Sequence, residues 1–209
     1  MKKVDIIHGG WLKAPNGASS VLRTLAESTS KFEEYGIQLS VYSMDLIVLK
    51  SFENIAAINQ RKGLRYFIKK NANANSILAF ISIYAIYLRH ARKIVKYYFD
   101  QGLEESRILF IHDIFTCYYY LKYRSRRQKT VLVLHNNGDT FNMLRQYYPV
   151  LNKSRLYSIL LYIERKVLSE VDKVLLVAET PKDTFVQLLP DIPIEKVGFV
   201  YNGILRKEL

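Results

Sequence analysis

The sequence contains a single cysteine, Cys117, among its 209 residues. One cysteine excludes an internal disulfide framework and is typical of a protein that folds in a reducing cytosol. Cys117 lies in the segment T-C-Y-Y-Y-L, with no second cysteine or histidine at the spacing of a metal site. We therefore interpret it as a small apolar core residue.

Long apolar runs are also absent. The most apolar stretch covers residues 77–88, whereas a helix that spans a membrane needs about 20 apolar residues. The first residues, Met1-Lys2-Lys3 and a short apolar run that ends in Gly-Gly, do not have the pattern of a signal peptide. The sequence therefore predicts a soluble or peripheral protein with a buried or interfacial helix at residues 77–88.

Several motifs that define enzyme classes are missing. The sequence has no G-x-G-x-x-G for a dinucleotide, no G-K-[ST] of a Walker loop, no G-x-S-x-G of a serine hydrolase and no H-E-x-x-H. The four histidines (8, 90, 112 and 135) are scattered along the chain, so we predict no metal site.

The basic residues are unevenly distributed. Residues 61–130 hold fifteen of the 31 basic residues and four of the 19 acidic ones, which is +11 of the total net charge of +12. Such asymmetry indicates an anionic partner, either nucleic acid or a membrane surface. A basic face that is merely solvated is the alternative.

Strand-like and helix-like segments alternate along the chain. Short apolar runs that begin at residues 4, 37, 107, 130, 173 and 196 predict six strands. Helices are predicted over 18–33, over 76–99 with Ser76 as its cap, over 154–170, and after Thr180 as an N-cap. This alternation is typical of a doubly wound, mainly parallel sheet. We predict an α/β fold with a single Rossmann-like domain over residues 1–209.

Polar residues follow four of the predicted strands directly or after a short loop. They are the Asn16-Gly17 loop, Asp113, His135-Asn136 and Glu179. The carboxyl ends of parallel strands meet at one edge, where such folds bind ligands. Glycine at a helix N-terminus also exposes N–H groups that attract phosphates. The alternatives are a plain turn at Asn16-Gly17, helix caps at Asp113 and Glu179, and a locally hydrogen-bonded His135.

The order of these segments resembles the N-terminal domain of group 1 (family 4) GT-B glycosyltransferases. The segments are P-N-G-A-S-S-V-L-R-T-L-A, G-I-Q-L-S-V-Y-S, V-L-V-L-H-N, V-D-K-V-L-L-V-A-E and K-V-G-F-V-Y-N-G-I. They cover nearly the whole chain in the order found in that family. Two positions depart from it, since Asn16 replaces the first of two paired glycines and Asn136 replaces an aspartate.

The resemblance implies transfer of a sugar from a nucleotide diphosphosugar to a glycan or lipid-linked acceptor, with no metal and no cofactor other than this donor. The N–H groups of Gly17, Ala18 and Ser19 would stabilise the leaving diphosphate, and His135 would be the catalytic residue that contacts donor or acceptor. Asp113 and Glu179 would shape the acceptor side. Further substrate contacts are expected at Asn16, Asn136 and Asn202, although Asn202-Gly203 also suits a simple turn.

The chain reaches V-Y-N-G-I where the second, nucleotide-sugar domain of that family would begin. We therefore expect the acceptor-side half of a glycosyltransferase, inactive by itself. Residues 61–130 suggest contact with an anionic membrane surface, which would place a cytoplasmic protein peripherally at the inner face of the cell membrane. A basic nucleic-acid-binding module, which we expect less, and a stand-alone sugar-nucleotide-binding domain are the alternatives, and the sequence leaves the oligomeric state open.

Overall fold

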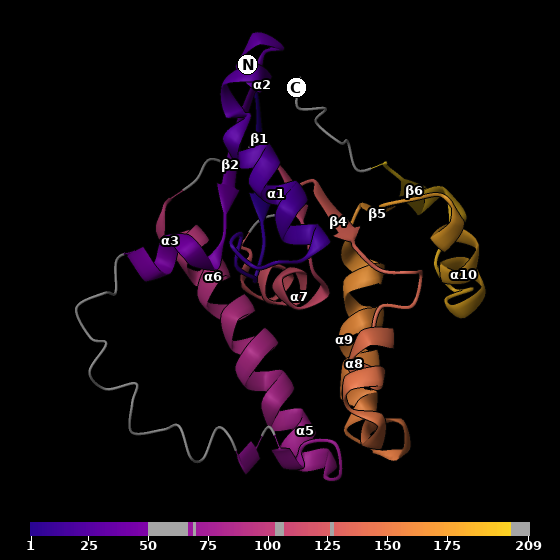
Figure 1. The fold of residues 1–209 in the computed structure, drawn as a ribbon. Coiled ribbons are helices and arrows are strands. Elements are labelled where there is room, and N and C mark those ends of the chain that lie inside the picture. Colours follow the sequence, from indigo (N-terminus) through magenta and orange to yellow (C-terminus); the bar gives the residue numbers. More distant parts are fainter. Residues whose placement is uncertain (50–66, 69, 103–106, 126–127, 202–209) are drawn as a thin grey trace, which may run out of the picture.

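The computed structural model describes residues 1–49, 67–68, 70–102, 107–125 and 128–201. Its centre is one sheet of six parallel strands in the order β2-β1-β3-β4-β5-β6 (Figure 1). The strands are β1 (Lys2–Ile7), β2 (Ile37–Tyr42), β3 (Ile108–Ile111), β4 (Thr130–Leu134), β5 (Lys173–Leu176) and β6 (Val197–Phe199). The six predicted strands and the Rossmann-like α/β fold are confirmed.

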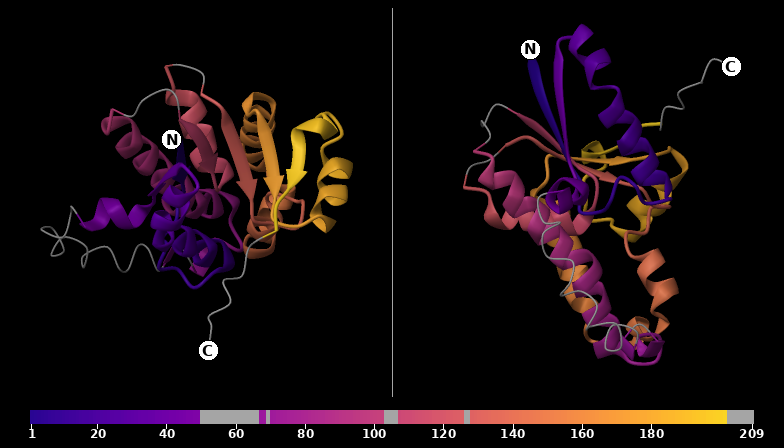
Figure 2. Two further views of the ribbon diagram at one scale, coloured as in Figure 1. Left: turned by 90° about the horizontal axis from the view of Figure 1, so that it is seen from above. Right: turned by 60° about the vertical axis from the view of Figure 1, so that its left-hand side comes forward.

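The sheet reverses its direction of growth once. The chain passes from β1 to β2 on one side, then crosses back over β1 to β3 and continues through β4, β5 and β6. Right-handed crossovers therefore place the helix after β1 on one face of the sheet and most of the later helices on the other. Figure 2 shows the sheet between these two layers.

The first helical segment is broken in two. Helix α1 (Gly17–Glu27) and helix α2 (Thr29–Glu34) meet at Ser28. The amide of Ser28 donates to the carbonyls of Thr24 and Leu25 at the end of α1. The continuous helix predicted over residues 18–33 is therefore wrong at this position.

A continuous helix leads from the far end of the molecule back to the sheet. It consists of α5 (Ser76–Ile83), a π-helical turn η2 (Tyr84–Leu88) and α6 (Arg89–Asp100). The predicted helix is confirmed, but its cap is not Ser76: the Asn75 side chain accepts from the amides of Ile77 and Leu78 at 3.0 and 3.1 Å. No helix in the described part of the chain is long and apolar enough to cross a membrane.

The remaining helices connect the later strands. They are α3 (Met44–Leu49), α7 (Ile114–Tyr123), α8 (Asn142–Tyr147), the 3-10 turn η3 (Pro149–Lys153), α9 (Tyr157–Glu170), α10 (Thr180–Leu188) and the 3-10 turn η4 (Ile194–Lys196). Thr180 is the first residue of α10 rather than its N-cap. Glu179 occupies the N-cap position, and its side chain makes no capping hydrogen bond.

The core lies mainly between the sheet and helices α6, α7 and α9. Strand residues that share one face by register, such as Ile111, Leu132 and Val174, are fully buried. They belong to one apolar cluster with residues of these helices. The cluster includes Cys117, which is fully buried in α7, as its interpretation as an apolar core residue predicts.

The most deeply buried carboxylate among the described residues is that of Asp5. Asp5 of β1 is fully buried, its Oδ1 lies 2.6 Å from Nη1 of Arg107, and its Oδ2 accepts from the hydroxyl of Tyr98 at 2.8 Å. Burial and the neighbouring Asp5 carboxylate both raise the pKa of Tyr98, so its hydroxyl stays a donor. The three residues join β1, α6 and the segment that leads into β3.

Candidate functional site

The topology places a switch point between β1 and β3. The chain leaves the carboxyl ends of these neighbouring strands in opposite directions, toward β2 and toward β4. In open parallel sheets the crevice outside such a switch point is where ligands bind. The candidate site is therefore built from the residues that follow β1, β3 and β4.

A histidine follows each of these three neighbouring strands. His8 comes after β1, His112 after β3 and His135 after β4. The amide of His8 donates to the carbonyl of Tyr42 at 2.9 Å, and that of His112 to the carbonyl of Ile7 at 3.0 Å, so the sheet ladder extends to both residues. Nδ1 of His112 and Nε2 of His135 lie 2.8 Å apart, a hydrogen bond between the two rings.

These three histidines are scattered along the chain, and the neighbouring strands bring them to the same edge of the sheet. His135 was recognised as a candidate from the sequence, while His8 and His112 were missed. Both follow a short apolar strand in the same way as His135 does. That shared position, rather than any spacing between histidines, is the signal that could have found them.

Burial keeps the three imidazoles neutral. It lowers the pKa of His135 to about 4, with a further decrease from the charge of His8. Burial also lowers the pKa of His112 well below its ordinary value, and neighbouring His135 and His8 act in the same direction. The pKa of His8 is lowered by burial too, although Asp113 and Asp45 partly oppose the decrease. Each ring therefore offers one N–H donor and one acceptor nitrogen at neutral pH.

Asp113 ties the histidines to the loop after β1. Its Oδ1 accepts from the amide of Thr116 at 2.7 Å and so caps helix α7, and its Oδ2 accepts from the amide of Gly9 at 2.9 Å. Oδ2 also lies 3.7 Å from Nδ1 of His8, a buried nitrogen without a hydrogen-bond partner among the described residues. The helix-cap interpretation of Asp113 is confirmed, and a contact with an acceptor stays a prediction.

Gly9 is required by the close approach of this loop to α7. A Cβ at Gly9 would lie 2.5 Å from Oγ1 of Thr116 and 3.2 Å from Oδ2 of Asp113. Gly17 lies at the other end of the loop, and no atom of the described residues comes within 4 Å of a Cβ added there. The two glycines have different roles: one lets the loop pack, and the other leaves its end accessible.

The loop is held by polar contacts along its length. Oδ2 of Asp45 accepts from the amide of Leu12 at 2.6 Å. Oδ1 of Asn16 accepts from the amide of Ser19 at 2.8 Å and caps α1, and the buried Ser19 hydroxyl donates to the Trp11 carbonyl at 2.7 Å. The amide and the hydroxyl of Ser19 therefore both stabilise the loop.

Two backbone donors are left at the start of α1. The first amides of a helix have no acceptor within the helix itself. Because Asn16 accepts from Ser19, the amides of Gly17 and Ala18 are the donors that a ligand could use. They lie at the positive end of the α1 dipole.

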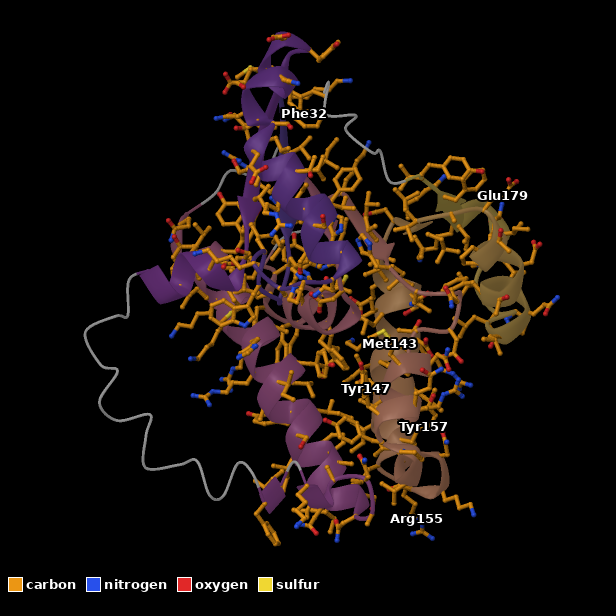
Figure 3. The ribbon with its side chains drawn as sticks, in the orientation of Figure 1. Phe32, Met143, Tyr147, Arg155, Tyr157 and Glu179 are labelled. Carbon is orange, nitrogen blue, oxygen red and sulfur yellow. The ribbon has the colours of Figure 1, made fainter. Side chains whose placement is uncertain are left out.

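The other predicted site residues lie elsewhere on this edge. Oδ1 of Asn136 accepts from the amide of Gly138 at 2.9 Å and so closes its own turn. Glu179 is exposed and lines a separate depression together with Lys182 and Tyr201, whose hydroxyl donates to Oε2 of Glu179 at 3.4 Å. Figure 3 shows Glu179 at the end of the molecule formed by β6 and α10. Asn202 lies outside the described residues.

The described part of the chain contains no group of three or more histidine, cysteine or acidic side chains that could hold a metal ion. Of the three histidines, His112 and His135 are joined by a hydrogen bond between their rings, and Nδ1 of His8 lies near the Asp113 carboxylate. The arrangement can instead bind a polar, uncharged or anionic ligand through hydrogen bonds.

The fold and the site define an α/β, Rossmann-like domain with a polar site at its topological switch point. Comparison with models of known protein families finds no match to this chain, and neither does comparison with curated proteins. The case for a function therefore depends on the geometry described above.

Proposed function

We propose that the chain is the N-terminal, acceptor-side domain of a GT-B-type glycosyltransferase, which transfers a sugar from a nucleotide diphosphosugar to a glycan or lipid-linked acceptor. The observation that carries the proposal is the arrangement at the switch point. His8, His112 and His135 follow the neighbouring strands β1, β3 and β4, and the anchored loop that begins after His8 leads to the open N-terminus of α1. A diphosphosugar combines an anion with sugar hydroxyls. The N-terminus of α1 suits the anion, and the histidines suit the hydroxyls.

The amides of Gly17 and Ala18 would bind the diphosphate. Negative charge develops on the leaving diphosphate as the bond to the sugar breaks, and fixed N–H dipoles stabilise that charge without reorganisation. Gly17 supports this role because no atom of the described residues lies within 4 Å of the position that a Cβ would occupy. Ser19 would act indirectly, by holding the loop through Trp11.

His135 would contact the donor sugar or the acceptor hydroxyl. Its Nε2 is engaged with His112, which leaves Nδ1 for a substrate. With a pKa of about 4 the ring is neutral at physiological pH, so it can exchange hydrogen bonds with hydroxyl groups but carries no charge to attract the diphosphate. His8, whose Nδ1 has no hydrogen-bond partner among the described residues, would be a second contact to the same ligand.

The test is binding of inorganic pyrophosphate to Gly17→Asp and Gly17→Asn, measured by calorimetry. An acidic residue in the first turn is favourable for the α1 dipole, so the Asp variant should fold as well as the unchanged chain. We expect Gly17→Asp to lose pyrophosphate binding through repulsion and Gly17→Asn to retain it. Equal binding by the two variants would contradict the proposed phosphate site.

A further inference from the structure

The continuous helix formed by α5, η2 and α6 exposes one face of unusual composition. Near its N-terminus, Ile77, Ile81 and Tyr84 are 62%, 41% and 46% exposed. Along α6, the same face continues with exposed basic residues. The resulting α5–α6 stripe consists of Ile77, Ile81, Tyr84, Arg89, Arg92 and Lys96.

The π-helical turn η2 keeps this stripe in line. Its members follow one another after three or four residues, except for the step of five from Tyr84 to Arg89 across η2. A π-helical turn bonds residue i to i+5 and takes up an extra residue, so a step of five stays on one face there. The buried side makes the same step, from Ile83 to Leu88. One helix about 37 Å long, at roughly 1.5 Å per residue, thus presents a single exposed face that is apolar in α5 and basic in α6.

The apolar end of the stripe lies far from the sheet. Figures 1 and 2 show the α5–α6 helix and the α8–α9 segment projecting in the same direction, and α5 packs against η3 at their ends. Exposed Lys153 and Arg155 belong to this end, where Figure 3 shows Arg155. Phe67, 55% exposed, and exposed Lys70 precede α5. The projecting end is therefore both apolar and basic.

The positive charge of the α5–α6 helix indicates an anionic partner. Residues 76–99 contain no acidic side chain. Exposed isoleucines with a tyrosine, followed by Lys and Arg on one helix face, match the layers of a bilayer interface: acyl boundary, headgroup level and lipid phosphates. A nucleic acid would bind the basic residues but leave the isoleucines in water. A second copy of the chain would face the basic residues with basic or apolar ones.

We propose that the α5–α6 stripe is a membrane-docking surface whose apolar end enters a bilayer containing anionic lipids. The isoleucines enter the acyl boundary, and the arginines and Lys96 contact the phosphates of the headgroups. The docking itself is independent of sugar transfer. Its implication that the acceptor is lipid-linked depends on the proposed function.

The first test is vesicle flotation of the chain with phosphatidylcholine alone and with equal parts of phosphatidylcholine and phosphatidylglycerol. We expect flotation only with the anionic vesicles. Changing Arg89, Arg92 and Lys96 together to Gln should reduce the partition coefficient about a hundredfold, since each basic residue near an anionic surface contributes about fivefold. The matched control, with Lys2, Arg23 and Lys31 changed to Gln, should float like the unchanged chain.

The second test removes the apolar end. Ile77→Ser with Ile81→Ser should reduce the partition coefficient at least about tenfold, whereas Leu188→Ser with Ile194→Ser, at 54% and 57% exposure on the other side of the molecule, should not. No flotation of the unchanged chain, equal flotation with neutral vesicles, or equal losses in stripe and control variants would overturn the proposal. A chain that floats but fails to bind pyrophosphate would support the docking surface and contradict the proposed function. A chain that binds pyrophosphate but does not float would support the proposed function and overturn the docking surface.

Discussion

Asp113 is the residue that joins the parts of the candidate site. One oxygen caps α7, the other receives the amide of Gly9, and the same carboxylate approaches His8. A short side chain after β3 thereby fixes the loop after β1. This explains why the residue combines the features of a helix cap with those of a site residue.

At the same scale, Gly9 and Gly17 form a matched pair of substitutions. Gly9→Ala should lower the free energy of unfolding by about 1–3 kcal/mol, because its Cβ would collide with Thr116. Gly17→Ala should leave stability unchanged or raise it by up to about 1 kcal/mol, because the space is open and its φ is not positive. Urea unfolding measures both, and equal effects would contradict the packing described for the loop.

The buried histidines predict a dependence of stability on pH. The pKa of each is lowered in the folded chain, that of His135 to about 4, so the unfolded chain binds more protons as the pH falls below about 6.5. Their stabilising effect is complete above pH 6.5 and decreases as the pH falls, by about 1.4 kcal/mol per pH unit for each fully neutral histidine. Glu164, whose pKa is raised by burial, acts in the opposite direction.

Unfolding in urea at a series of pH values checks this prediction. His135→Asn should flatten the dependence between pH 5 and 6.5, where most carboxylates stay ionised. A free energy of unfolding that is constant over this window in the unchanged chain would contradict the burial of the three rings.

At the scale of elements, the start of the α5–α6 helix distinguishes two neighbouring polar residues. Asn75→Ala should cost about 1 kcal/mol of stability, because it removes the acceptor for the amides of Ile77 and Leu78. Ser76→Ala should be nearly neutral, because alanine suits the first helical turn. Thermal unfolding of the two variants decides between them, and a larger loss for Ser76→Ala would contradict the observed cap.

The buried Asp5–Arg107 pair connects β1 to the segment before β3. Arg107→Met should cost about 3–5 kcal/mol, because it leaves the Asp5 carboxylate buried without its counter-charge. Adding Asp5→Asn should restore a large part of that loss, since Asn carries no charge and still accepts from Tyr98. Urea unfolding of the single and double variants measures the recovery; a double variant as unstable as Arg107→Met would contradict this account.

At the scale of the whole molecule, sequence patterns predicted the sheet well because its strands are short apolar runs separated by helical segments. Its switch point could not be predicted, since strand order depends on how distant segments pack. The histidine cluster could not be predicted for the same reason. His8 and His112 are more than a hundred residues apart and come to the same edge only because β1 and β3 are neighbours. A search with a fixed helical period predicts neither the break at Ser28 nor the extra residue in η2.

The predicted site residues also differ in whether local sequence or distant packing determines their position. Asn16 and Asp113 cap the helices that they precede and Gly17 begins α1, so local patterns identified them. Glu179 follows β5 as expected, but it lies with Tyr201 at the β6 side rather than with the histidines. Being at the end of a strand was sufficient to place a residue on the edge, but not within the site.

The switch-point edge is proposed to bind a nucleotide diphosphosugar. The most direct test of this proposal is the NMR spectrum of the labelled chain during titration with UDP-glucose and GDP-mannose as representative donors. The account predicts that the amides of Gly17 and Ala18 shift together with the ring signals of His8 and His135, for at least one donor. Shifts confined to the α5–α6 stripe or to the surface around Glu179, or no shifts with either donor, would contradict it.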